Sequence, residues 1–253
     1  MAVERSVVTD YLDQRLQAVG WPDYGPNGLQ VEGSKNIERL ALGVSACDEL
    51  FTQAVAWQAQ GVLVHHGILW DAMPLALTGV QYGRVKTLIE GGLNLIAYHL
   101  PLDAHPEIGN NAVAARRFGL LDIEPFGEHN GRTIGFCGRF PEPITPQQLT
   151  DKSADIFGQQ ARSFLNGPNP VRSIGIISGG AQSEFHQAIA KGLDAYVTGE
   201  ASEWVMNWAR ETGTHYLAAG HYATERLGIQ ALGNELESKF DLEVRFFDIP
   251  NPV

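Results

Sequence analysis

Short apolar runs alternate with amphipathic stretches along the first part of the chain. Leu40–Val44, Val62–Val64 and Leu93–Tyr98 are apolar runs of the length of a buried strand. Asp48–Gln58 and Val80–Glu90, which lie between them, have the spacing of helices with one apolar face. The alternation of strand and helix predicts parallel strands covered by helices, which is the α/β class.

Further helices are expected at both ends of this region. Ser6–Val19 has apolar residues at helical spacing and is followed by a run of glycine and proline, and Asn110–Phe118 closes the region. Residues 122–170 are richer in glycine, proline and polar residues, and only Thr133–Phe140 alternates like a strand. A hinge is predicted at three prolines, namely Pro141, Pro143 and Pro146.

The strand and helix pattern resumes at Val171. The elements expected there are Ser173–Ile177, Ala195–Thr198, His215–Ala219 and Leu242–Asp248 as strands, and Ser183–Lys191, Ser202–Glu211 and Ala223–Phe240 as helices.

The two parts of the chain resemble each other. A constant shift of 134 positions pairs Phe51 with Phe185 and Leu63 with Val197, and a shift of 122 pairs His99 with His221. We therefore expect an internal duplication that gives two similar α/β halves, 1–124 and 125–253.

Composition narrows the class of function. The 253 residues carry a formal net charge of −11, which opposes binding to the phosphate backbone of nucleic acid or to anionic membranes. No apolar run approaches the ~18 residues of a membrane span, and no signal peptide is evident at the N-terminus. Cys47 and Cys137 form no metal-binding or disulfide pattern. These features predict a soluble, cytoplasmic protein.

A histidine pair follows one of the predicted strands. His65 and His66 lie at the carboxyl end of the strand that contains Val62–Val64, which is where open α/β sheets place their ligand sites. Neighbouring side chains of an extended backbone point to opposite sides, so the pair could serve two different ions. The alternative is a pair of histidines in a surface loop.

A second histidine is followed by a carboxylate four positions later. His221 and Glu225 begin a predicted helix after a strand, and this spacing puts both on one helix face, where they can bind the same ion. A carboxylate can also bridge two ions. The alternative is a glutamate that only stabilises the start of the helix.

The third predicted strand of the first half leads into a polar loop. Asp103 is the candidate metal ligand there, and His99 and His105 are imidazoles that could bind a metal, carry a proton or hold the loop. Pro101 and Pro106 are expected to keep this loop out of helix. Three strand ends thus supply the histidines and carboxylates that a two-metal hydrolytic site needs.

Several separated motifs carry a family resemblance over nearly the whole chain. The motifs are Pro26–Gly33, Val64–Gly67, His99–His105, Gly109–Asn111, Thr198–Glu200, Ala219–Glu225 and Asp248–Pro252. In this order they resemble the YbgI-like members of the NIF-three-like proteins, also called the GTP cyclohydrolase I type 2 family.

The resemblance implies a dinuclear centre with two divalent metal ions per subunit. Its ligands would be His65, His66, Asp103, His221 and Glu225, with Glu225 as the bridge. Close relatives have a second histidine at the position of Tyr222, so Tyr222 is left out of the ligand set. Imidazole and carboxylate donors suit zinc, iron, manganese, cobalt and nickel alike. The family further implies two α/β halves with the metal site between them, in a toroidal homohexamer.

The reaction implied by the family name is hydrolytic opening of the GTP imidazole ring with release of formate. His99 and His105 would then move protons as catalytic residues. Two alternatives stay open: hydrolysis of another nucleotide or a phosphoester by the same ions, and a metal-binding regulatory or assembly protein without catalysis. Gly179 and Gly180 could approach a phosphate, but no lysine of a P-loop follows them.

Overall fold

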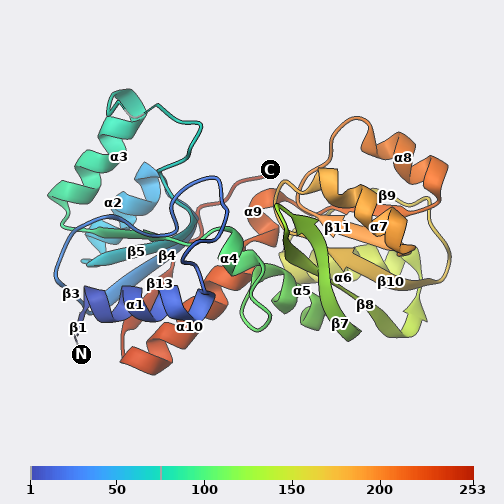
Figure 1. Ribbon diagram of the computed structural model, residues 1–253, viewed down its shortest axis with the longest axis horizontal. Helices are drawn as coiled ribbons and strands as arrows, with labels where there is room; N and C mark the ends of the chain where they lie inside the picture. The colour runs from blue at the N-terminus through green and yellow to red at the C-terminus, as the bar shows by residue number, and fades with distance from the viewer. Residues whose placement is uncertain (1, 75) are drawn as a thin grey trace. The chain divides into compact units, whose positions relative to one another are not determined.

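The computed structural model describes residues 2–74 and 76–253, which form two compact units (Figure 1). Unit 1 comprises Met1–Leu102 and Ile229–Pro250, and unit 2 comprises Asp103–Gly228 and Asn251–Val253. This division differs from the expected halves of 1–124 and 125–253. The reason is that the last strand, β13 (Glu243–Phe246), pairs with a strand from the beginning of the chain and so returns to unit 1.

Unit 1 contains a five-stranded sheet in the order β13-β4-β5-β6-β2. The strands other than β13 are β2 (Gly28–Val31), β4 (Arg39–Ser45), β5 (Gly61–His66) and β6 (Asn94–Ala97). β13, β4, β5 and β6 run parallel, and β2 is antiparallel at the edge next to β6. β1 (Val3–Glu4) and β3 (Asn36–Ile37) form a separate small ribbon. The carboxyl ends of β5 and β6 therefore lie at the same edge of this sheet.

Helices cover both faces of the unit 1 sheet (Figure 1). On one face lie α2 (Asp48–Ala56) and α3 (Gly79–Glu90), whose buried Phe51 and Leu88 pack on the strands. On the other face lie α1 (Arg5–Leu16) and α10 (Arg226–Phe240). These two helices are joined by an ion pair of 2.8 Å between Arg15 Nε and Glu235 Oε1. The strands are apolar on both sides because both faces are covered, as the continuous apolar runs predicted.

Unit 2 contains a six-stranded sheet in the order β7-β8-β10-β11-β12-β9. Its strands are β7 (Leu121–His129), β8 (Arg132–Ile144), β9 (Arg162–Phe164), β10 (Val171–Ile176), β11 (Ala195–Thr198) and β12 (His215–Ala218). β10, β11 and β12 are parallel, and β9 is antiparallel at the edge next to β12. Each sheet thus has a parallel set that ends in an antiparallel strand taken from earlier in the chain. The internal duplication itself stays a prediction.

The helices of unit 2 also cover both faces of their sheet. α5 (Asn110–Phe118) and α6 (Pro146–Phe157) pack on one face. On the other face lie α7 (Phe185–Lys191) and α8 (Val205–Thr212). A 3-10 turn at Gln182–Glu184 directly precedes α7. The rings of Phe185 and Tyr216 meet edge to face at 4.9 Å between centroids on this second face. Two short helices remain, α4 (Leu100–Asp103) and α9 (His221–Thr224).

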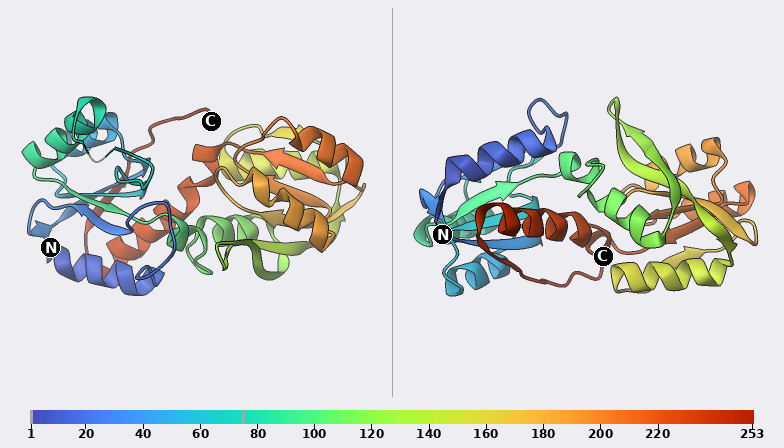
Figure 2. Two further views of the ribbon diagram at one scale, coloured as in Figure 1. Left: turned by 45° about the horizontal axis from the view of Figure 1, so that its top comes forward. Right: turned by 90° about the horizontal axis from the view of Figure 1, so that it is seen from below.

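Two local predictions in unit 2 differ from the structure. The segment before Thr133–Phe140 is a strand, β7, joined to β8 in a hairpin through Asn130 and Gly131, both with positive φ (Figure 2). Asn-Gly is the favoured sequence for such a turn, so the signal was present. Pro146 begins α6 instead of a hinge, because Thr145 and Gln148 form a capping box and proline fits a first helical turn.

Two further predictions, both about short helices, also differ. Pro101 does not keep its loop out of helix, since it lies in the first turn of α4, where its missing N–H is not needed. The helix expected over Ala223–Phe240 is divided at Glu225 into α9 and α10. Within residues 2–74 and 76–253, no helix combines the length and the apolarity required to cross a membrane.

Candidate metal centre

Three imidazoles gather at the carboxyl ends of β5 and β6 in unit 1. His65 and His66 end β5, and His99 follows β6. One ring nitrogen from each lies within 4.8 Å of the other two. The ring centroids of His65 and His66 are 4.7 Å apart, so the two side chains do not point to opposite sides as strict strand alternation predicts. The alternation fails because the strand ends at His66.

Each imidazole of this cluster is held through its Nδ1 atom. In His65, which is fully buried, Nδ1 lies 3.0 Å from the carbonyl oxygen of Tyr98. Because a carbonyl only accepts, Nδ1 carries the proton and Nε2 carries the lone pair that a metal would bind. Ser45 Oγ lies 3.0 Å from Nδ1 of His66.

The partner of His99 is the carboxylate of Asp23, whose Oδ1 lies 2.7 Å from His99 Nδ1. Burial would raise the pKa of Asp23, but the hydrogen bond and the charge interaction with His99 outweigh it and lower the pKa below its ordinary value. Asp23 also accepts a hydrogen bond from the backbone N–H of Leu100. A carboxylate behind a histidine in this way orients the ring and strengthens it as a metal ligand.

Unit 2 contributes carboxylates. Asp103 is 5% exposed, and its Oδ1 accepts hydrogen bonds from Asn110 Nδ2 at 2.8 Å and from Ser178 Oγ at 2.9 Å. A carboxylate oxygen of Asp103 lies within 4.8 Å of one of Glu225, which is 2% exposed. Two buried carboxylates this close repel each other unless a cation or a proton stands between them.

His221 lies between two glutamates. Its Nδ1 is 2.6 Å from Glu200 Oε1, and its Nε2 is 3.3 Å from Glu225 Oε1. Burial alone would lower the pKa of His221, but the hydrogen bonds and charges of Glu225 and Glu200 raise it to about 9. In the metal-free protein the imidazolium of His221 therefore supplies positive charge to a cluster of acidic groups. A divalent ion would replace that proton.

A glycine makes room for this arrangement. Gly179 follows β10 with φ +68°, and a Cβ atom there would lie 2.2 Å from Glu225 Oε1 and 3.2 Å from His221 Nε2. Its backbone N–H donates to Thr224 Oγ1 at 3.0 Å, which ties it to α9. The absence of a side chain at Gly179 therefore lets Glu225 and His221 lie close to the backbone. From the sequence, the only role considered for the Gly179-Gly180 pair was contact with a phosphate.

His105 lies outside these groups. Its Nδ1 accepts hydrogen bonds from the backbone N–H groups of Glu107 and Ile108 at 3.1 and 3.2 Å. The imidazole thus holds the loop before α5 in its fold. This was one of the alternatives left open from the sequence.

Each set of donors, taken by itself, fits a divalent metal by its chemistry. Unit 1 offers three imidazoles, and unit 2 offers two carboxylates and one imidazole, which are the donors that first-row transition metals prefer. The supporting residues Asp23, Ser178 and Glu200 were not singled out from the sequence. The signals for Glu200 were its place in the motif Thr198–Glu200 and its position after a predicted strand, which corresponds to that of His66 under the 134-residue shift.

The sequence matches the Duf34/NIF3 (NGG1p interacting factor 3) family over residues 3–252. It is 43% identical over 253 residues to a Pseudomonas aeruginosa protein and 39% identical over 246 residues to one from Escherichia coli K12, both named GTP cyclohydrolase 1 type 2 homolog. The alignments cover 100% of both chains in the first case and 96% of each chain in the second.

Two solved structures are similar throughout. One, titled as the protein ybgI of unknown function, has a TM-score of 0.94 and 37% identity, and covers 99% of this chain and 100% of its own. The other, TTHA1606 from Thermus thermophilus, has a TM-score of 0.91 and 35% identity over the same shares of the two chains.

Proposed function

The chain belongs to the Duf34/NIF3 family, and from this premise we propose that it is a metal-dependent hydrolase with two divalent ions per subunit. The observation that carries the proposal is the donor set itself: three imidazoles with fixed Nδ1 partners in unit 1, and two close, buried carboxylates in unit 2. We propose that both sets serve one dinuclear centre between the units, with His65, His66, Asp103, His221 and Glu225 as ligands and Glu225 as the bridge.

A bound divalent ion supplies a Lewis acid and lowers the pKa of water toward neutrality. The residues of this chain would do the rest. Asp103 is fixed by Asn110 and Ser178, so its carboxylate is oriented before a metal arrives. Glu200 holds His221 from behind in the same way.

His99 is the candidate for proton transfer. The carboxylate of Asp23 holds the ring through Nδ1, which leaves Nε2 as the nitrogen that would exchange a proton with the substrate. His105 remains a second candidate. Its Nδ1 accepts two backbone hydrogen bonds, so the proton of the neutral ring is on Nε2.

The substrate that the names of the relatives suggest is GTP. We propose that the reaction opens its imidazole ring by hydrolysis and releases formate. Elemental analysis of the native protein, His65→Ala and Glu225→Ala, coupled to assays for formate and for phosphate, tests the proposal. We expect bound metal and formate release in the native protein and loss of both in the variants. Full metal content in the variants would disprove the ligand assignment.

The same experiment separates the alternatives. Release of phosphate without formate would indicate hydrolysis of a phosphoester or of another nucleotide by the same centre. A protein that is fully loaded with metal and inert toward a broad panel of metabolites would be a metal-binding regulatory or assembly protein.

We further propose that the chain forms the toroidal homohexamer that the family resemblance implies. Light scattering during size exclusion chromatography should then give a mass six times the 27.6 kDa of one chain. A monomer or dimer at micromolar concentration would contradict this.

A further inference from the structure

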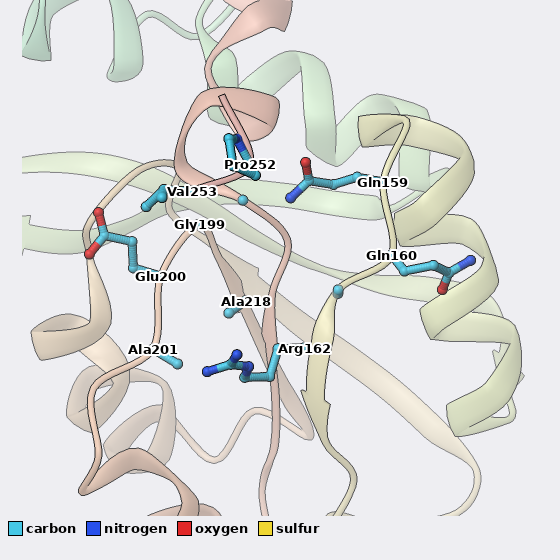
Figure 3. Close-up of a pocket in the computed structure, with 11 residues that line it drawn as sticks. Gln159, Gln160, Arg162, Gly199, Glu200, Ala201, Ala218, Pro252 and Val253 are labelled. Carbon is cyan, nitrogen blue, oxygen red and sulfur yellow. The ribbon is translucent and has the colours of Figure 1, made fainter. Parts of the chain in front are cut away.

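Unit 2 contains a cavity of about 670 Å³ that none of the proposed metal ligands lines (Figure 3). It opens at the carboxyl ends of the parallel strands β11 and β12, the edge at which α/β sheets bind ligands. Its walls are formed by residues that follow β11, by the ends of β12 and β9, by the segment before β9 and by the last residues of the sequence. Its volume lies within the range of roughly 300–1,000 Å³ that is usual for small-molecule sites.

Small residues keep the cavity open. Gly199, Ala201, Ala218 and Gly220 line it and contribute almost no side chain. A Cβ atom on Gly220, which has φ +94°, would lie 1.9 Å from Gln159 Nε2. A larger residue at Gly220 would therefore displace the amide of Gln159 and close part of the space.

Arg162 is the one cationic side chain among the described residues that line this cavity. Its guanidinium extends between Ala201 and Ala218 (Figure 3). Among residues 2–74 and 76–253, no hydrogen bond or ion pair engages this guanidinium. A guanidinium offers a planar fork of donors that matches an oxyanion with two coplanar oxygens, such as a phosphate or a carboxylate.

Gln159 adds a second polar group. Figure 3 shows its amide directed toward Pro252, whereas the amide of Gln160 points away from the cavity. A side-chain amide both donates and accepts hydrogen bonds. It can therefore pair with a ligand group that also does both, such as the edge of a base or another amide.

The one acidic side chain in the described part of the cavity wall, Glu200, is engaged by His221 at 2.6 Å. The carboxylate of Glu200 is therefore held by an imidazole, and an anionic ligand would not meet an isolated carboxylate. Through this contact the wall of the cavity is also joined directly to a candidate metal ligand of the same unit.

We propose that this cavity, which we call the Arg162 cavity, binds the body of the substrate. The ligand would be an organic molecule that presents an oxyanion to Arg162 and a hydrogen-bonding group to Gln159. The proposal rests on the proposed function, because the bound molecule is taken to be the one on which the metal centre acts.

Titration calorimetry on the full chain tests the cavity with four probes: GTP, guanosine, inorganic pyrophosphate and malonate. Arg162→Ala should weaken the binding of GTP and of pyrophosphate about 10- to 100-fold and leave the affinity for guanosine unchanged. Arg162→Lys should restore only part of the affinity, because a lysine keeps the charge and loses the fork. Gln159→Leu should weaken guanosine several-fold. If Arg162→Ala weakens the binding of malonate and not that of pyrophosphate, the oxyanion is a carboxylate.

Arg172→Ala is the matched control, since Arg172 is an exposed arginine of β10 in the same unit and does not line the cavity. It should bind every probe as the native protein does. Equal affinities of Arg162→Ala and native protein for all probes, or no binding of any probe at millimolar concentration, would overturn the proposal.

The outcome is separable from that of the metal centre. If binding depends on Arg162 while His65→Ala and Glu225→Ala keep their metal, the cavity stands and the proposed metal ligands fail. If those variants lose metal while Arg162→Ala binds normally, the metal centre stands and the cavity assignment fails.

Discussion

The two units use similar parallel strands to present opposite chemistry. After β5 and β6, unit 1 presents the imidazoles of His65, His66 and His99. After β11 and β12, unit 2 presents Glu200 and His221, and Asp103 and Glu225 add two more carboxylates. The candidate donors of unit 1 are all imidazoles, and those of unit 2 are mostly carboxylates.

The difference shows in how each set is stabilised without metal. In unit 1 each imidazole is satisfied from behind, by a carbonyl, a hydroxyl or a carboxylate. In unit 2 the carboxylates raise the pKa of His221 to about 9, so a proton takes the place of a cation. A shared strand arrangement thus fixes where donors lie, and the residues behind them fix their charge.

Removal of a carboxylate from unit 2 should have the largest effect. Glu225→Gln keeps the volume of the side chain and removes its charge, and we expect the affinity for divalent metal to fall by more than about 100-fold. His66→Gln in unit 1 should cost less, because it removes no charge. Metal content by elemental analysis and competition with a chelator measure both, with the exposed Glu211→Gln as control. If both variants lost metal affinity equally, the negative charge of the unit 2 carboxylates would not determine how tightly the metal binds.

Gly179→Ala should disturb unit 2 without removing any donor. Its Cβ would overlap Glu225 Oε1, so we expect a loss of about 2–4 kcal/mol in the free energy of unfolding and weaker metal binding. Gly192→Ala is the matched control, because Gly192 has φ +73° and open space around its Cβ position. The free energy of unfolding of Gly192→Ala should fall by only about 1 kcal/mol, and this variant should bind metal normally. Equal losses in urea unfolding would refute the contact argument.

Asp23→Asn should weaken unit 1 moderately. The change keeps the shape behind His99 and removes the charge, so metal affinity should fall about 10-fold. Since the pKa of Asp23 is lowered in the folded protein, its stabilisation is present above its ordinary pKa of 3.8 and is lost as the pH falls through the lowered value. The native protein and Asp23→Asn should therefore differ in urea unfolding at pH 7 and converge in strong acid. A constant difference across pH would contradict this.

Glu200→Gln should give the smallest and most local change. In the metal-free protein the pKa of His221 should fall from about 9 toward 6.5, because one of two raising carboxylates is gone. The raised pKa means that charged His221 stabilises the fold below pH 6.5 and that this contribution is lost as the pH rises through about 9. NMR titration of the imidazole protons measures the shift. An unchanged pKa would assign the whole effect to Glu225.

Much of the fold could be predicted because the buried parallel strands are short and mostly apolar. The predicted runs Leu40–Val44 and Ala195–Thr198 fall within β4 and β11. β7 could not be predicted in this way, since five of its nine residues are exposed and its pattern is that of an edge ribbon. β9 was too short, at three residues, to show a pattern.

The candidate donors could be picked out from the sequence because they follow strand ends. Their supports could not, because Asp23 reaches His99 from 76 positions away and Ser178 reaches Asp103 from 75. No local spacing encodes such a pair. Only the folded arrangement of the loops brings them into contact.

The return of β13 to the first sheet has a consequence for how the molecule is made. During synthesis from the N-terminus, β4 can pair with β5 but lacks its second parallel neighbour, β13, until residue 243 has emerged. Unit 1 therefore keeps an open sheet edge while Asp103–Gly228 of unit 2 is translated. A ribosome-bound nascent chain that stops before α10 should therefore expose an unpaired strand edge and be a substrate for chaperones.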